Sequence, residues 1–270
     1  MRVVVCAMAK NEHLYINEWC KHYLDLGVDH IYIYDNDDLK SQYVGCYINQ
    51  RYESKVSIIN IRGWKRQKLQ NDIYTYFYMK YNRTFDYCLF CDIDEFLDGV
   101  KDIKSWLSSL NSPIQVRIKW RLFGDDGLIK RDAKKPVYGF FKKEITKSLN
   151  RNLIDKGDLE IQGKFIIKGK LNNYKFGSVH YVSYASKKEP LPSVLPSGKP
   201  CKSGVRIRED YSGETIYLNH YMTKTLEEFV NQKLNRNDAV FNQTLKLDYY
   251  WRINEKTPEK LDYLKKRGLL

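Results

Sequence analysis

Strand-like and helix-like segments alternate through residues 1–100, and few folds are compatible with that order. Residues 3–8 form a continuous apolar run, as expected of a strand covered on both faces. Further strand-like runs lie at residues 30–34, 56–61 and 87–91. Residues 14–26 and 68–81, between these runs, have their apolar residues at helical spacing. This alternation predicts an α/β fold with a mostly parallel, Rossmann-like sheet flanked by helices.

The pattern is less regular after residue 100. Residues 186–215 are rich in Pro, Ser, Gly and Lys and predict a loop or a lid. Thr225 and Glu228 form a capping-box pattern and predict the start of a helix. The remaining predicted elements are helices at 103–110 and 257–266, a strand at 114–120, and short alternating runs at 160–185. With no repeat and no clear linker, we expect one domain over residues 1–270.

Polar clusters follow three of the predicted strands. They are Lys10-Asn-Glu12, Asp35-Asn-Asp-Asp38 and Asp92-Ile-Asp-Glu95. Ligands of open α/β sheets bind beyond the carboxyl ends of the strands. We therefore expect the three clusters to face one crevice.

The third cluster is the most informative, because Asp92, Asp94 and Glu95 repel one another unless they are solvated or paired. In an extended backbone, Asp92 and Asp94 point the same way and can hold one cation. Their oxygen ligands favour Mg²⁺ or Mn²⁺. The alternative is a strand end whose carboxylates pair with nearby Lys or Arg. Cys88 and Cys91 lie in apolar surroundings and predict core packing rather than a metal site.

The net charge of +13 is unevenly distributed along the chain. Residues 1–100 contain 12 Lys or Arg and 14 Asp or Glu, whereas residues 101–270 contain 34 and 19. A basic surface attracts nucleic acid, anionic lipid headgroups or phosphorylated substrates. Six Cys without framework spacing fit a reducing cytosol, and no secretion signal or membrane-spanning apolar run is present in the sequence. We expect a cytoplasmic protein that can attach peripherally to the inner face of a membrane.

Several segments together resemble glycosyltransferases of family 2 and the related family 92. The matching segments are Ala9-Lys-Asn-Glu12, residues 18–28, residues 32–36, Asp92-Ile-Asp-Glu-Phe-Leu97, residues 120–127, residues 179–181 and residues 219–229. The resemblance implies a GT-A fold, a nucleotide-sugar donor and a Mn²⁺ or Mg²⁺ ion held by Asp92 and Asp94. It also divides the domain into a donor-binding half (1–100), an acceptor-side half (101–235) and a helical extension (236–270).

The resemblance further places donor-binding residues. Asn11, Glu12 and Asp35 would line the nucleoside pocket, and Asp92 would contact the donor as well as the metal. The alternatives are that Asn11 and Glu12 cap the following helix and that Asp35 shapes a turn. A distant His completes the metal sphere in many GT-A enzymes, and His220 is the predicted ligand. His180 is a weaker candidate for a site role.

Two further roles are predictions from residue chemistry. Arg66 and Gln67 could reach a diphosphate or a sugar hydroxyl, or could simply begin a surface helix. Asp125 and Asp126, between two glycines, are candidate catalytic bases for the acceptor hydroxyl, with a capped turn as the alternative.

The predicted function is a metal-dependent glycosyltransferase of surface polysaccharide or lipopolysaccharide synthesis. Its acceptor would be a glycan or a lipid-linked glycan, docked against an anionic membrane surface, with no nucleic acid as a partner. The alternatives are a basic nucleic-acid-binding module, for which the acidic strand ends are a liability, and a catalytically inactive scaffold of the same fold.

Overall fold

The computed structural model describes residues 1–132, 134–145, 162–187, 189–237 and 242–270. Its strands are β1 (Val3–Ala9), β2 (His30–Asp35), β3 (Val56–Asn60), β4 (Tyr87–Phe90), β5 (Glu95–Asp98), β6 (Gln115–Leu122), β7 (Gly163–Lys168), β8 (Ser193–Val194), β9 (Pro200–Cys201) and β10 (Tyr217–His220). Its α-helices are α1 (Ile16–Asp25), α2 (Leu69–Tyr81), α3 (Ile103–Ser109), α4 (Leu226–Gln232), α5 (Leu247–Tyr250) and α6 (Pro258–Lys266). Short 3₁₀ helices lie at His13–Tyr15, Lys40–Gln42, Val44–Cys46 and Gln50–Lys55.

The strands form one mixed sheet in the order β3-β2-β1-β4-β7-β6-β10-β5, with β8 and β9 added beside β6. The block β3-β2-β1-β4 is parallel throughout, and β10 and β8 also run parallel to β6. β7 is antiparallel to both of its neighbours, and β5 is antiparallel to β10. The predicted α/β class with a mostly parallel sheet is therefore confirmed.

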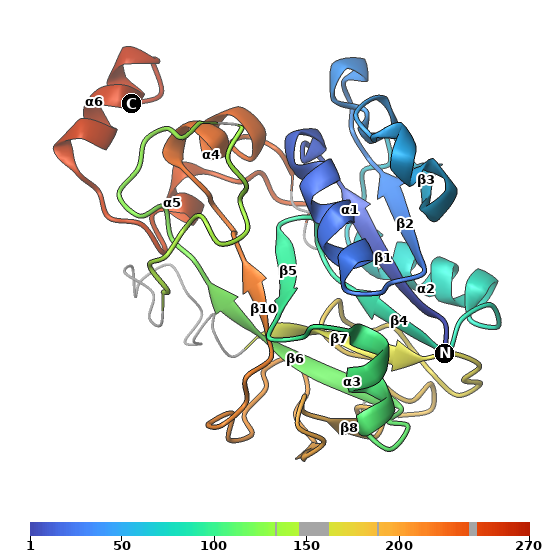
Figure 1. Cartoon of the computed structure of the whole chain (residues 1–270). Helices are drawn as coiled ribbons and strands as arrows, with labels where there is room; N and C mark the ends of the chain where they lie inside the picture. The colour runs from blue at the N-terminus through green and yellow to red at the C-terminus, as the bar shows by residue number, and fades with distance from the viewer. Residues whose placement is uncertain (133, 146–161, 188, 238–241) are drawn as a thin grey trace.

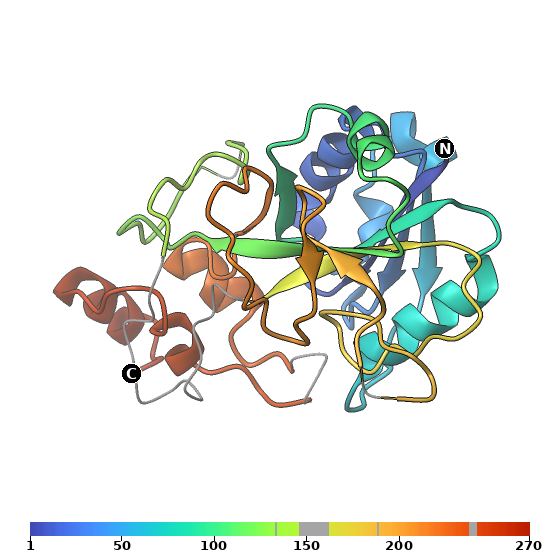
Figure 2. The same cartoon turned by 90° about the horizontal axis from the view of Figure 1, so that it is seen from below.

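Helices cover both faces of the parallel block, as Figures 1 and 2 show from two directions. The strand β1 alternates between the two layers. Val3 and Val5 pack with Trp19 of α1 on one face, whereas Val4 and Cys6 pack with residues of α2 on the other. A strand buried on both faces reads as the continuous apolar run seen in the sequence. The helices α4, α5 and α6 pack around a separate apolar cluster.

The order of the strands determines where a ligand can bind. The chain moves outward from β1 to β2 and β3, and it then returns to place β4 on the other side of β1. This reversal makes a topological switch point between β1 and β4, where the crevice of an open α/β sheet lies. Glu12 follows β1 and Asp92 follows β4, so both lie at this point.

The predicted elements of residues 1–100 are all present, and Gly27 ends α1 with a positive φ of 90°. The predicted capping box of Thr225 and Glu228 also forms. Four strands were not predicted. β5 and β10 pair with each other at the acidic cluster, and the two-residue strands β8 and β9 lie within the predicted loop or lid of residues 186–215. Among the described residues, no helix is both long enough and apolar enough to cross a lipid bilayer.

Candidate functional site

A cavity of about 1120 Å³ opens at the carboxyl ends of the parallel strands. Lys10 and Glu12 after β1, Asn36 after β2, and Asp92 and Asp94 after β4 all line it. The expected convergence of the three polar clusters on one crevice is thus confirmed. Residues from the far end of the chain complete the wall, among them Lys233, Arg236 and the segment 242–246.

The cavity carries a surplus of positive charge. The described residues that line it include nine Lys or Arg and four Asp or Glu. The basic residues are Lys10, Lys65, Arg66, Lys164, Arg206, Lys233, Arg236, Lys246 and Arg252, and the acidic ones are Glu12, Asp92, Asp94 and Asp248. A cleft lined mainly by one sign of charge concentrates ligands of the opposite sign. The arrangement favours an anionic ligand.

The backbone of the acidic cluster is not extended, and that part of the prediction is wrong. The Glu95 N–H donates to the Asp92 carbonyl at 3.1 Å and closes a turn through residues 93 and 94. In return, the Asp92 N–H donates to the Glu95 carboxylate at 2.9 Å. These reciprocal bonds start β5 directly after the turn. As a result, Asp92 and Asp94 contact different partners.

Each of the two aspartates is paired with a buried lysine. Lys164 of β7 lies 2.9 Å from Asp92, and its side chain is 1% exposed. Lys233, which follows α4, forms an ion pair with Asp94 and donates to the Met222 carbonyl at 2.7 Å. The alternative in which lysines neutralise the acidic strand end is therefore the arrangement in the structure.

Glu12 is held by three cationic side chains from the C-terminal part of the chain. Lys224 lies 3.1 Å from its carboxylate, Arg236 3.5 Å and Lys233 3.8 Å. The Lys224 ammonium also lies over the Tyr15 ring, 4.3 Å from its centroid. We refer to the following eight residues as the ion-pair cluster: Glu12, Asp92, Asp94, Glu95, Lys164, Lys224, Lys233 and Arg236.

Burial and charge act against each other on the pKa values of this cluster. Burial opposes ionisation of Asp94, but Lys233, His220 and Lys224 together outweigh it and hold the pKa of that carboxyl well below its usual range. Burial raises the pKa of Glu95 well above its usual range, although Lys164 opposes the shift. Burial disfavours the Lys164 ammonium, yet Asp92 and Glu95 raise its pKa.

The side chains, as they lie, do not fit the predicted metal site. The part of the chain that the structure describes holds no group of three or more His, Cys, Asp or Glu side chains able to bind a metal ion. The His220 Nε2 atom lies 3.6 Å from Asp94, but the Asp92 carboxylate contacts Lys164 and the Gln70 amide instead. The four acids of the ion-pair cluster already face four cations, so the site has no deficit of positive charge for a dication to fill.

Of the predicted nucleoside-pocket residues, Glu12 lines the cavity, whereas Asn11 and Asp35 are set back from it. Asp35 is fully buried and pairs with Arg62 at 2.8 Å, a partner that the sequence did not suggest. The Asn11 side chain donates to the Gln232 carbonyl at 2.9 Å and joins the start of the chain to α4.

Arg66 and Gln67 differ in position. Arg66 lines the cavity and pairs with Asp72 at 3.1 Å in an exposed ion pair. Gln67 is exposed and does not line the cavity. Gln70, in the first turn of α2, contacts Asp92 instead, because α2 begins at Leu69 and directs its first turn toward the switch point.

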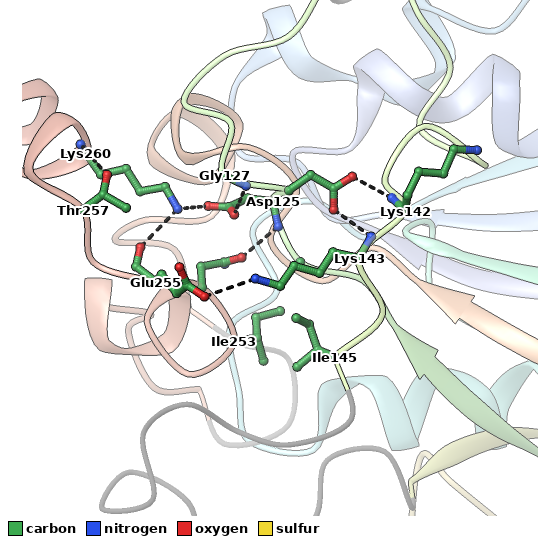
Figure 3. A pocket seen from close by; sticks show the side chains of 12 residues that line it. Asp125, Gly127, Lys142, Lys143, Ile145, Ile253, Glu255, Thr257 and Lys260 are labelled. Atoms are coloured by element: carbon green, nitrogen blue, oxygen red, sulfur yellow. Dashed lines mark hydrogen bonds and ion pairs between the residues drawn. The ribbon is translucent and has the colours of Figure 1, made fainter.

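Asp125 and Asp126 line a second cavity, of about 430 Å³, which shares no lining residue with the first. Asp125 is buried and forms an ion pair with Lys260 (Figure 3). It also accepts a hydrogen bond from the Tyr250 hydroxyl. Asp126 accepts from the backbone N–H groups of Lys142 and Lys143. The structure does not bring the two predicted bases to the large cavity.

Two histidines and Trp120 form one side of the large cavity. The Trp120 ring lies 4.6 Å from the His220 ring and 5.4 Å from the His180 ring. The His180 Nδ1 atom lies 2.8 Å from the Gly163 carbonyl, which can only accept, so this nitrogen carries the proton. Burial, together with the nearby Lys164, lowers the pKa of His180 to about 4. At neutral pH its Nε2 atom is therefore a hydrogen-bond acceptor.

The sequence reasoning missed Lys164, Lys224 and Lys233. One signal could have found Lys164, because it directly precedes the apolar run of residues 165–167 in a strand whose first five residues are all buried. No local pattern marks Lys233, since its partner Asp94 is 139 residues away.

No protein-family model matches the chain. The chain is a distant relative of a glycosyltransferase family 92 protein of Ricinus communis, with 23% identity over 159 residues. The match covers 56% of this chain and 28% of the relative, so the chain spans less than a third of the length of that protein. This finding bears out the resemblance to family 92, as a distant relationship.

Two solved structures are similar over part of the chain. TarS of S. aureus has a TM-score of 0.33 and 13% identity over 48% of this chain and 24% of its own. HddC of Yersinia pseudotuberculosis has a TM-score of 0.36 and 12% identity over 62% of this chain and 77% of its own.

Proposed function

We propose that this chain is a glycosyltransferase that moves a sugar from a nucleoside-diphosphate sugar to a hydroxyl group of a glycan or a lipid-linked glycan. The observation that carries the proposal is the cavity of about 1120 Å³ at the switch point, with its surplus of positive charge. A nucleoside diphosphate is an anion of suitable size for such a cavity. The distant relationship to a family 92 protein supports the same conclusion.

In the proposed reaction, a bond forms between the acceptor oxygen and the anomeric carbon of the sugar, and the bond from that carbon to the diphosphate oxygen breaks. The nucleoside diphosphate leaves with the electron pair and gains negative charge. Lys164 and Lys233 line the cavity and can stabilise that charge. Fixed positive groups that meet developing charge are a large source of rate enhancement.

The acceptor hydroxyl loses a proton in this step, and a base must take it. His180 is a candidate from the structure, because its Nε2 atom is unprotonated at neutral pH and its side chain lines the cavity. Negative charge arriving with the donor would raise the pKa of His180 from its low value and make it a stronger base. Asp125 and Asp126 remain candidates from the sequence.

We further propose that the acceptor belongs to surface polysaccharide or lipopolysaccharide synthesis and that the chain works against an anionic membrane surface. The last turn of α6 and the residue after it present three exposed basic side chains, Lys265, Lys266 and Arg267. Basic groups near a membrane each add attraction to anionic lipid without insertion. Co-sedimentation with vesicles that contain about 30% phosphatidylglycerol, a fraction similar to that of an anionic leaflet, tests this surface. Neutral vesicles are the control.

The experiment for the proposed activity is a screen of nucleotide sugars for hydrolysis, preceded by melting curves with uridine, guanosine, cytidine and thymidine diphosphates. We expect one base to raise the melting temperature and its sugar conjugates to be hydrolysed slowly. If no diphosphate shifts the melting temperature, and unrelated DNA binds at physiological salt instead, the glycosyltransferase proposal is wrong and the nucleic-acid-binding alternative is favoured.

A further inference from the structure

We propose that the cavity binds the diphosphate of its donor through the ammonium groups of Lys164 and Lys233, without a divalent cation. This inference rests on the proposed function and specifies which side chains bind the leaving nucleoside diphosphate. It replaces the predicted Mn²⁺ or Mg²⁺ by two side chains of the chain itself. Three features of the site support it: the charge balance of the ion-pair cluster, the hydrogen-bond donors that the lysines keep, and the place of both lysines in the cavity wall.

The charges of the ion-pair cluster balance one another. The ion-pair cluster contains four carboxyl groups and four cationic side chains, and every carboxylate in it lies within 4.0 Å of a lysine nitrogen. A dication binds where carboxylates have a deficit of counter-charge, and this cluster has none. A dication between Asp92 and Asp94 would take from each lysine its nearest carboxylate. It would leave Lys164 with Glu95 at 4.0 Å and Lys233 with Glu12 at 3.8 Å, a weaker pairing for two buried ammonium groups.

The two lysines keep hydrogen-bond donors for a ligand. An ammonium group has three N–H donors. Among the described residues, Lys164 uses one of them on Asp92, and Lys233 uses two, on Asp94 and the Met222 carbonyl. Counted over the described residues, each retains at least one N–H donor outside these hydrogen bonds, with a second carboxylate at 4.0 Å from Lys164 and at 3.8 Å from Lys233. Both residues line the cavity. They approach from different elements, Lys164 from β7 and Lys233 from the end of α4.

The role of Asp94 differs between a metal site and a lysine site, which allows a sharp test. If Asp94 is a metal ligand, its replacement by Asn weakens diphosphate binding. If Asp94 is a partner that competes with the ligand for Lys233, the same change releases the ammonium group, and binding stays equal or becomes tighter. Asp94→Asn keeps the side-chain volume, and Lys233 keeps Glu12 at 3.8 Å as a counter-ion, so we expect a folded protein of lower stability.

The experiment is calorimetric titration of the full chain with inorganic pyrophosphate and with uridine and guanosine diphosphates, once in EDTA and once in Mn²⁺. We expect dissociation constants that agree within about twofold between the two conditions, since ammonium–phosphate contacts supply the affinity. Lys233→Met should weaken pyrophosphate binding about tenfold or more. Asp94→Asn should bind pyrophosphate at least as tightly as the unchanged chain.

Lys260→Met is the matched control. Lys260 is also buried and paired with an aspartate, Asp125, but it lies outside the large cavity. The Lys260→Met variant should lose stability, as Lys233→Met does, but it should keep its affinity for pyrophosphate. Should Lys233→Met fail to fold, the EDTA comparison and Asp94→Asn still decide the matter.

Two results would overturn the inference. Diphosphate binding that occurs in Mn²⁺ and vanishes in EDTA, with loss of binding in Asp94→Asn, would establish a metal site and leave the proposed glycosyltransferase function standing. Absence of diphosphate binding under both conditions would overturn the proposed function as well, and the inference with it.

Discussion

Glu12 and Lys224 form a buried ion pair of 3.1 Å between the first strand of the sheet and the segment that precedes α4, although 212 residues separate them in the sequence. Both side chains are at most 5% exposed. The pair ties the wall of the large cavity to the helices of the C-terminal part. Replacing Lys224 is the most direct test of whether this ion pair stabilises the cavity wall.

Lys224→Met should destabilise the protein, because it removes the closest partner of a buried carboxylate. Breaking a buried pair by removing one member costs about 3–5 kcal/mol of the free energy of unfolding. Urea denaturation followed by tryptophan fluorescence measures the loss. The exposed pair of Lys21 and Asp25 provides the control, since Lys21→Met should leave stability almost unchanged. Equal stability of the two variants would contradict the role given to Lys224.

Asp125→Asn should lower the melting temperature by several degrees, because it leaves the buried Lys260 ammonium without its carboxylate. Its affinity for nucleoside diphosphates should stay the same, since Asp125 lines the smaller cavity and not the larger one. Differential scanning calorimetry and diphosphate titration measure the two effects separately. A marked loss of affinity at unchanged melting temperature would mean that the two cavities act as one site.

Asp37→Asn should stabilise the protein above neutral pH. Burial, with a further contribution from the neighbouring Asp35, raises the pKa of Asp37 from an ordinary 3.8 to about 7. Between these two values the folded protein binds a proton that the unfolded chain does not, so the stability of the unchanged chain falls as pH rises from 4 to 7. The variant lacks this titration. Melting curves from pH 4 to pH 8 should therefore converge at the acid end and separate at the alkaline end.

Trp64→Ala should weaken the binding of nucleoside diphosphates and leave the binding of inorganic pyrophosphate unchanged. Trp64 lines the large cavity and is 51% exposed, so its indole is available to stack on a nucleobase. Stacking of one base on an aromatic side chain contributes about 1–3 kcal/mol, or roughly a five- to 150-fold change in affinity. Tyr76→Ala is the control, because Tyr76 is similarly exposed but lies outside the cavity. Equal losses for both ligands would place the base elsewhere.

The arrangement of the first hundred residues could be predicted because each strand is a short apolar run and each helix keeps its apolar residues on one side. The convergence of Glu12, Asn36 and Asp92 followed from the same pattern, since the carboxyl ends of parallel strands share one edge of the sheet. These are local signals combined with one topological rule.

The partners of the acidic cluster could not be predicted in the same way. Lys164 and Lys233 lie 72 and 139 residues from the aspartates that they contact, and no local pattern links such positions. The turn at residues 93 and 94 was also not predicted. The apolar run before it favours an extended backbone, but the reciprocal hydrogen bonds of Asp92 and Glu95 stabilise a turn instead.

The distribution of opposite charges along the chain has a consequence for synthesis on the ribosome. The nascent chain carries Glu12 and Asp94 long before their counter-ions emerge, because Lys233 follows Asp94 by 139 residues and Lys224 follows Glu12 by 212. Until then the strand ends repel one another and cannot be desolvated. The ion-pair cluster is thus among the last features to form during translation, and a product terminated before Lys224 would lack it.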